Sequence, residues 1–266
     1  MEQIFDFFNV NVSNIPVPSV CRYELNKCYC RDSIQAMRKI KSKSFDLVIA
    51  DPPFAIDFDK LSQGSCYNRK GDNVLTGYVE VSVNSYYDFS LKWIRESKRI
   101  VKDDGIVIIV SGWSNQKDIL NACSDIGLVL LNQIIWRHQF GPFTKRKMVS
   151  SHYNIFIFVK DRKNYTFNKV LWYPEDVMYS EQWEPEIMEI NKEYWINKKK
   201  TPTKLPKELV EMLVVIFSNK GDLLCDPFSC AGTILKVSNY MGRFCLAFDV
   251  VKEYVDFSNE RLDLEY

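Results

Sequence analysis

Residues 222–233 read DLLCDPFSCAGT, an apolar run that ends in an acidic residue and is followed by a turn of small residues. The apolar run predicts a buried strand ending at Asp226, and the small residues predict a tight turn that enters a helix at about Gly232. A second apolar run, residues 243–249 (RFCLAFD), follows this helix and ends in Asp249. Two strands joined by a crossover helix form the unit from which parallel sheets are built, so this stretch predicts an α/β fold.

The same alternation of short apolar runs and amphipathic segments extends over most of the 266 residues. Apolar strands with helices between them indicate a mostly parallel sheet covered on both faces, that is, a doubly wound sheet. The seven predicted strands lie at 27–30, 45–50, 105–110, 128–137, 153–159, 222–226 and 244–248. The predicted helices lie at 32–41, 86–102, 114–125, 207–218, 232–241 and 250–262.

Two segments depart from this pattern within what we expect to be a single domain, residues 1–266. Residues 55–84 are polar and rich in Gly and Asn, which predicts a long, mobile loop at a strand end. Residues 161–200 combine three Trp residues with weak periodicity and end in three consecutive Lys residues, so we expect a small inserted lobe there.

Composition is that of an ordinary globular protein. Hydrophobic residues make up 46% and charged residues 26% of the sequence, which excludes disordered, collagen-like and coiled-coil chains. No apolar run is long enough to span a bilayer and the first residues lack a signal-peptide pattern, so we expect a cytoplasmic protein with no membrane partner. The eight cysteines are dispersed and the two histidines lie in no ligand-type spacing, so we expect reduced thiols and no metal site.

The tetrapeptide Asp51-Pro52-Pro53-Phe54 directly follows the predicted strand 45–50. Two successive prolines fix φ and remove two N–H donors, so the Asp carboxylate and the neighbouring carbonyl are held as acceptors facing the same space. A planar amino group fits that space, and the Phe54 ring can stack on an attached aromatic base. The alternative is a strand-to-loop turn in which Asp51 only caps and the prolines only end the strand.

The 222–233 segment places backbone N–H groups and a helix N-terminus beneath a ligand, and Gly232 allows a close approach of another backbone or of a cofactor. An acidic residue at the end of the second strand, here Asp249, commonly holds the ribose hydroxyls of a nucleoside cofactor. No G-x-G-x-x-G fingerprint and no phosphate-binding loop is present, which favours a nucleoside cofactor without phosphates. The alternative is a βαβ unit in which Asp226 and Asp249 merely cap helices.

Together and in this order, the two motifs resemble the amino-directed (N6-adenine or N4-cytosine) DNA methyltransferases, in the permuted group whose catalytic motif precedes the S-adenosylmethionine motif. The similarity covers most of residues 25–262. Its further matches are Cys30-Arg31-Asp32, Trp136, His152, residues 201–206 (TPTKLP) with Lys204 and Pro206, Asp226-Pro227-Phe228, Gly232-Thr233, and Gly242-Arg243 leading to Asp249. The resemblance implies a Rossmann-like methyltransferase fold, with the 161–200 lobe recognising the target.

This chain departs from the family pattern at three places. Cys230 and Ala231 stand where Gly and Ser are usual, and a Cys at a position that needs positive φ would be strained. Leu205-Pro206 replaces the usual Lys-Pro pair, with Lys204 one position early. Tyr153 follows His152 where an acidic residue is common.

The resemblance implies methyl transfer from S-adenosylmethionine to the N6 amino group of a flipped adenine in DNA. The motif 51–54 would be catalytic, with the Asp51 carboxylate and the Pro52 carbonyl on the amine and Phe54 on the base. The residues implied in cofactor binding are Asp32, Lys204, Pro206, Asp226, Phe228, Gly232, Thr233 and Asp249. Asp in first place favours adenine, with N4-cytosine as the alternative; an inactive DNA-binding or partner subunit on the same scaffold is the alternative of another class. Methylation of cytosine C5 is disfavoured because the sequence has no Pro-Cys pair.

DNA must be held by local charge. Twelve Lys and Arg residues stand against eight Asp and Glu between residues 136 and 200. The predicted phosphate contacts are the two basic runs Lys145, Arg146, Lys147 and Lys198, Lys199, Lys200, and the alternative for each run is a solvated basic face. Double-stranded DNA, a cognate restriction endonuclease and a second copy of the chain are the partners that the resemblance suggests.

Overall fold

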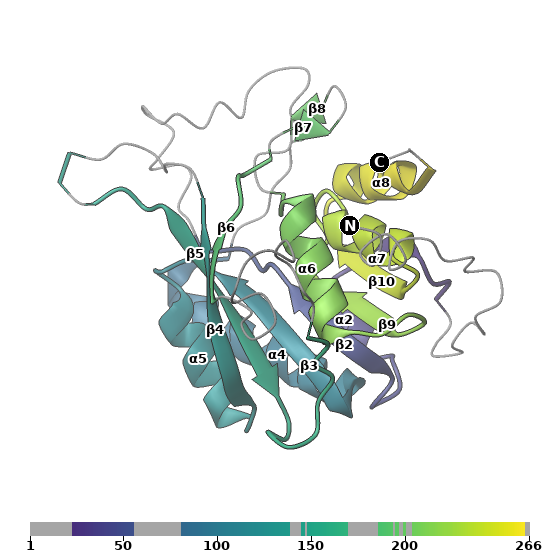
Figure 1. Ribbon diagram of the computed structural model, residues 1–266, viewed down its shortest axis with the longest axis horizontal. Coiled ribbons are helices and arrows are strands. Elements are labelled where there is room, and N and C mark those ends of the chain that lie inside the picture. The colour runs from purple at the N-terminus through teal and green to yellow at the C-terminus, as the bar shows by residue number, and fades with distance from the viewer. Residues whose placement is uncertain are drawn as a thin grey trace, which may run out of the picture.

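The computed structural model describes residues 23–55, 81–138, 145–146, 148–169, 186–193, 195–196, 199–200 and 204–263 (Figure 1). Their centre is an eight-stranded sheet with the strand order β1-β10-β9-β2-β3-β5-β4-β6. The strands are β1 (Lys27–Cys30), β2 (Phe45–Ala50), β3 (Val101–Ser111), β4 (Val129–Arg137), β5 (His152–Val159), β6 (Ile187–Glu189), β9 (Leu223–Asp226) and β10 (Phe244–Asp249). A separate two-stranded pair joins β7 (Trp195–Ile196) to β8 (Lys199–Lys200).

The sheet is mostly parallel, as predicted. Only β5 runs opposite to the other seven strands of this sheet, because it pairs antiparallel with both β3 and β4 while the remaining neighbours pair parallel. All seven predicted strands are present in the sheet. The eighth, β6, is a three-residue strand within the 161–200 segment, and it is too short to leave a periodic signal in the sequence.

Helices cover both faces of the sheet, which confirms the doubly wound arrangement (Figure 1). One face packs against α2 (Ser33–Met37), α4 (Tyr86–Ile100) and α5 (Gln116–Asp125), and the other packs against α6 (Lys207–Phe217), α7 (Thr233–Tyr240) and α8 (Lys252–Glu260). Short 3-10 turns precede α4 (η2, Val83–Ser85) and follow α8 (η3, Arg261–Asp263). Successive strand residues alternate between the two cores: in β3, Ile106 and Ile108 face α6, and Val107 and Ile109 face α4. Each strand therefore reads as a continuous apolar run.

The connections reverse direction between β9 and β2, the two central neighbours. From β2 the chain proceeds to β3 through α4 on one face, and from β9 it proceeds to β10 through α7 on the opposite face. Such a reversal opens a crevice at the carboxyl ends of the two strands, where ligands bind in doubly wound sheets. Asp51 follows β2 and Asp226 ends β9, so both predicted motifs lie at this crevice.

The two irregular segments lie partly outside the described residues: 56–80 of the predicted loop, and 170–185, 194 and 197–198 of the predicted lobe. The described start of the lobe packs on the main domain, since the Asn168 backbone N–H donates to the Ile216 carbonyl of α6 at 2.7 Å. In the described ranges, no helix is long and apolar enough to cross a bilayer, and no group of His, Cys, Asp and Glu could hold a metal ion. The six described cysteines are free thiols.

Candidate active site

Residues 51–54 leave the end of β2 as a fixed turn. The Asn115 side chain, which is 4% exposed at the start of α5, donates a hydrogen bond to the Phe54 carbonyl oxygen. The next residue, Ala55, has a φ of +52°, a left-handed conformation that costs about 1–3 kcal/mol unless the surroundings hold it. The half-buried Asp51 carboxylate is thus presented by a backbone with little freedom.

An aromatic wall lies beside this turn. It consists of Phe54, Trp136, His138 and Tyr153, with Tyr153 in contact with each of the others. The Tyr153 ring centroid lies 5.5 Å from that of Phe54, 5.3 Å from that of Trp136 and 5.0 Å from that of His138. Trp136 and His138 are buried, whereas Phe54 and Tyr153 are partly exposed, so these two rings are the ones on which a flat, aromatic ligand can stack.

The loop after β9 contains two buried polar groups that lack a partner within the described structure. Asp226 is fully buried, and its Oδ1 accepts a hydrogen bond from the Phe228 N–H at 3.3 Å. The Ser229 hydroxyl lies close enough to this carboxyl group to lower its pKa, but neither the hydroxyl nor Asp226 Oδ2, both of them buried, forms a well-aligned hydrogen bond in the described chain. Unsatisfied buried polar groups are costly, so they mark a place where a polar ligand group fits.

The loop is held from below by Asp249 of β10. The Asp249 carboxylate accepts the N–H of Cys230 on Oδ2 and the N–H of Val251 on Oδ1, each at 2.8 Å. Cys230 has a φ of +46°, which confirms the strained left-handed conformation expected from the sequence. The Ser258 hydroxyl donates to the Cys230 carbonyl at 2.9 Å, so the strained residue is hydrogen-bonded on both sides.

Gly232 has a φ of +73°, and a Cβ built there would lie 2.7 Å from Ser258 Cβ. The sequence suggested that a backbone or a cofactor approaches closely at Gly232. In the structure the neighbour that approaches closely is Ser258 of α8, so Gly232 allows the start of α7 to pack against α8.

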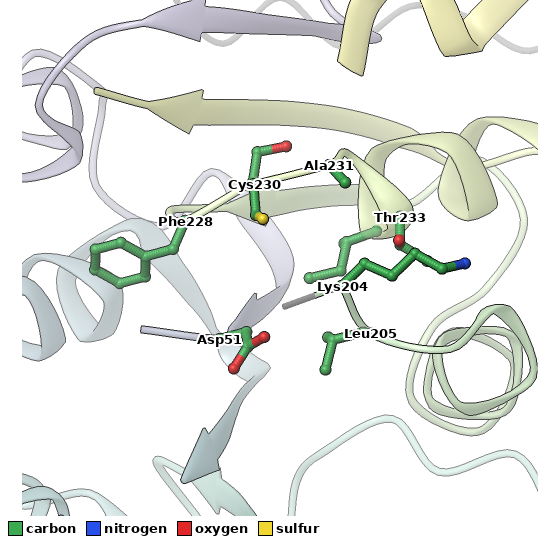
Figure 2. A pocket seen from close by; sticks show the side chains of 9 residues that line it. Asp51, Lys204, Leu205, Phe228, Cys230, Ala231 and Thr233 are labelled. Atoms are coloured by element: carbon green, nitrogen blue, oxygen red, sulfur yellow. The ribbon is translucent and has the colours of Figure 1, made fainter. Parts of the chain in front are cut away.

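The two motifs face each other across one pocket, lined by Asp51, by residues 204–205 and by residues 228–231, 233 and 234 of the loop and α7. Figure 2 shows the Asp51 carboxylate and the Cys230 sulfur directed into the space between the strand end and the loop. The Phe228 ring points away and packs edge-on against Trp93 of α4, with centroids 5.3 Å apart.

Lys204 contributes its stem to the pocket, and its amine points away from Asp51 (Figure 2). The Lys204 ammonium forms an ion pair with Glu193. The other oxygen of the Glu193 carboxylate accepts the N–H of Lys207 at the start of α6, at 3.1 Å. The Lys204 amine is therefore held in an ion pair and points away from Asp51, and the next residue, Leu205, lines the pocket.

The crevice is acidic and its carboxyl groups are poorly solvated. Burial raises the pKa of Asp51 to about 7, and the nearby Lys192 ammonium lowers it. Burial also raises the pKa of Asp226 well above its usual range and raises the pKa of Asp249. Three carboxyl groups of this kind suit a ligand that carries positive charge and disfavour a phosphate.

Of three further predicted cofactor residues, Thr233 lines the pocket and Pro206 and Asp32 do not. Thr233 lines it as the first residue of α7. Pro206 is the N-cap residue of α6 and is not among the pocket-lining residues. Asp32 is exposed and caps α2, since its Oδ1 accepts the Gln35 N–H at 2.8 Å. It nonetheless shares the sheet edge with Asp249, because β1 pairs with β10.

Of the predicted DNA-binding residues, Lys145 and Arg146 are exposed in the turn between β4 and β5. Lys147 and Lys198 lie outside the described residues. The backbone of Lys199 and Lys200 forms β8, and the position of their side chains is not described.

Sequence reasoning missed four residues that build the site: Asn115, Tyr153, Lys192 and Glu193. Tyr153 could have been found, because it is the first residue of a predicted strand and stands where the family pattern has a different residue. The other three lie in loops far along the chain from the residues they contact, and nothing in their local sequence indicates a partner.

Comparison with known proteins places this geometry in context. A family model described as DNA methylase, of the N6/N4 methyltransferases, matches residues 45–260. Type II methyltransferase M.HpaI of Haemophilus parainfluenzae is 29% identical over 250 residues, which cover 89% of this chain and 74% of that protein. The PvuII DNA methyltransferase (cytosine-N4-specific) has a TM-score of 0.67 at 17% identity, covering 90% of this chain and 86% of its own. The M1.HpyAVI-SAM complex has a TM-score of 0.62 at 21% identity, covering 90% of this chain and 99% of its own. The fold is that of the methyltransferases.

Proposed function

The chain belongs to the N6/N4 DNA methylase family, and on that premise we propose that it transfers a methyl group from S-adenosylmethionine to the N6 amino group of a flipped adenine in DNA. One observation carries the proposal. The Asp51 motif and the loop after β9, which are far apart in the sequence, line a single pocket at the crevice between β2 and β9.

The loop side of the pocket fits the cofactor. Bound S-adenosylmethionine supplies a methyl group on a positively charged sulfur, so that the reaction depends on alignment more than on acid–base catalysis. The Asp226 carboxylate and the Ser229 hydroxyl, both buried without a partner within the described structure, bind hydrogen-bond donors of the cofactor. Asp249 holds the ribose hydroxyls from the end of β10, and its carboxylate is already fixed by the Cys230 and Val251 N–H groups.

The other side of the pocket binds the target. The Asp51 carboxylate and the Pro52 carbonyl accept the two hydrogens of the amine, which directs the nitrogen lone pair toward the methyl group. The base stacks on Phe54, beside Tyr153 of the aromatic wall. Because the amine is inaccessible in a duplex, the base leaves the helix at an unstacking cost of a few kcal/mol.

Asp in the first position of the motif supports adenine as the target. Cytosine N4 is the second candidate, favoured by the fold likeness to the cytosine-N4-specific PvuII enzyme. The basic residues at 145–147 and 198–200 contact DNA phosphates, and the segments 55–84 and 161–200 read the DNA sequence around the target.

The test is a single incubation of the protein with DNA and S-adenosylmethionine carrying a tritiated methyl group, followed by chromatography of the hydrolysed nucleosides. We expect the label in N6-methyladenine and none with Asp51→Ala. The control is Asp103→Ala, an exposed residue paired with Lys43 away from the pocket, which should leave transfer unchanged. Label in N4-methylcytosine would instead select the second candidate, and unlabelled DNA of every sequence tried would reject the function.

A further inference from the structure

Residues 190–193, which directly follow β6, are held by hydrogen bonds or ion pairs at both ends. At one end, the Trp136 indole N–H donates to the Ile190 carbonyl at 2.8 Å, and the Ile190 N–H donates to the Arg137 carbonyl at 3.1 Å. At the other end, Glu193 pairs with Lys204 and accepts the Lys207 N–H. The residues between these two attachments therefore have a fixed position above the aromatic wall.

Lys192 lies between the attachments and extends onto the wall. Its Nζ donates to the Tyr153 hydroxyl at 3.2 Å and lies 4.6 Å from the centroid of the Tyr153 ring. Tyr153 in turn lies against Phe54, the last residue of the target motif. The geometry thus brings a half-buried ammonium from the 161–200 segment to the target side of the pocket.

We propose that Lys192 is a positioning residue that provides the counter-charge of Asp51 and so keeps this carboxylate able to accept hydrogens from the target amine. The proposal rests on the function proposed above for Asp51. It also links the segment that carries Lys192 to the reaction, because displacement of that segment would remove the counter-charge.

The electrostatics of the pocket support this role. Burial lowers the pKa of Lys192 to about 8 while Asp51 raises it, and the Lys192 charge lowers the pKa of Asp51 against the effect of burial. Among the described residues, the other charged groups around the pocket do not supply this interaction. Lys204 is neutralised by Glu193, and Asp226 interacts unfavourably with a charged Asp51. Lys192 also contacts the uncharged side chain of Tyr153, whose ring lies against His138.

The first experiment measures the ionisation of Asp51 directly, so that its result does not depend on methyl transfer. The protein is labelled with 13C at the Asp carboxyl carbons, and the Asp51 signal is assigned by its loss in Asp51→Asn. In Lys192→Met the Asp51 titration should move upward by about one pH unit, and in Lys192→Arg it should stay near the wild-type value. Lys160→Met is the matched control, since Lys160 is also partly buried but bonds to the Val101 carbonyl at the far end of the sheet.

The second experiment measures the rate of methyl transfer against pH at saturating DNA and cofactor. With an Asp51 pKa of about 7, half of the wild-type carboxyl groups are ionised at pH 7, and a shift of about one unit leaves about a tenth, a loss of roughly fivefold. The loss should disappear at about pH 9, where Asp51 is ionised in both proteins. Lys192→Arg should keep the wild-type profile.

Two outcomes would overturn the proposal. One is an Asp51 titration in Lys192→Met identical to wild type. The other is an unchanged kcat profile with weaker DNA binding and a reduced salt dependence, which would make Lys192 a phosphate contact. A wild-type protein that methylates no DNA would reject the proposed function alone, because the Asp51 titration would still test the counter-charge.

Discussion

Replacement of Gly232 by Ala should destabilise the protein through two separate effects. The first is conformational, because a φ of +73° places an L-residue in the left-handed region at a cost of about 1–2 kcal/mol. The second is steric, because the new Cβ would lie 2.7 Å from Ser258 Cβ and 3.0 Å from Ser258 Cα. The Ser258 backbone cannot rotate away as a side-chain tip could, and overpacking of this kind costs about 1–3 kcal/mol.

The unfolded chain loses some freedom when Gly becomes Ala, which returns about 0.4–1 kcal/mol. The net loss in the free energy of unfolding should be about 1–4.5 kcal/mol, which lowers Tm by roughly 2–4 °C for each kcal/mol in a chain of this size. Calorimetry and urea titration measure both quantities. The affinity for S-adenosylmethionine should fall as well, because Ser258 also holds the Cys230 carbonyl of the cofactor loop.

Two further variants separate the effects. Gly112→Ala is the control, since a Cβ there would meet the Phe54 ring at 3.6 Å and the Asn115 Oδ1 at 3.9 Å, both ordinary contacts. In Ser258→Gly the 2.7 Å contact with Cβ is removed while the 3.0 Å contact with Cα remains. Gly232→Ala in that background should therefore lose the conformational part and only a reduced steric part, and the two substitutions should be less than additive. A Gly232→Ala protein within 0.5 kcal/mol of wild type would show that this reading of the loop is wrong.

Three other changes test the division of roles in the site. Asp51→Ala should abolish methyl transfer with cofactor affinity largely kept, whereas Asp249→Ala should weaken cofactor binding in a calorimetric titration; equal losses of affinity would contradict the assignment. Neutralising residues 145–147 together should weaken binding to all DNA sequences and reduce the slope of log K against log salt by about 0.9 for each lost contact, and a loss limited to one sequence would indicate base reading. Cys230→Gly should relieve backbone strain of about 1–3 kcal/mol and tighten cofactor binding or raise Tm, and a clear fall in both would count against strain at this turn.

The sequence predicted those parts of the molecule in which local pattern and tertiary environment agree. The strands on either side of the crevice are continuous apolar runs because both of their faces are buried, so β2 and β9 were found with their ends correct to within a residue. The helix predicted at 32–41 ends at Met37, since the residues after it form turns that the periodicity does not distinguish from a helix. β6 was missed because three residues carry no period, and its pairing with β4 depends on contacts made elsewhere in the chain.

The features of the site also fall into those that the sequence predicted and those that it did not. Asp51, Asp226 and Asp249 were identified because each ends a strand, and the carboxyl ends of parallel strands meet at one edge of the sheet. The sequence does not show which groups donate hydrogen bonds to each carboxylate or offset its charge. Asp249 is bound by the backbone N–H groups of Cys230 and Val251, Asp226 keeps an unpartnered buried oxygen in the described structure, and the charge of Lys192 lowers the pKa of Asp51 against the effect of burial.

These three environments differ in what they leave for a ligand. The Asp249 carboxylate is already oriented by two N–H groups, so it can accept a hydrogen bond from a ligand hydroxyl without being buried further. A carboxyl group without a partner, as at Asp226 Oδ2, has a raised pKa and gains most from a ligand that brings positive charge. Asp51 is intermediate between these cases. The charge of Lys192 favours its ionised form, and its carboxylate is directed into the pocket, where it can accept hydrogens from an amine. If the cationic cofactor binds next to Asp226 and the amine binds at Asp51, as proposed, the two halves of the pocket are coupled through the charges of these two carboxyl groups, because each charge affects the ionisation of the other.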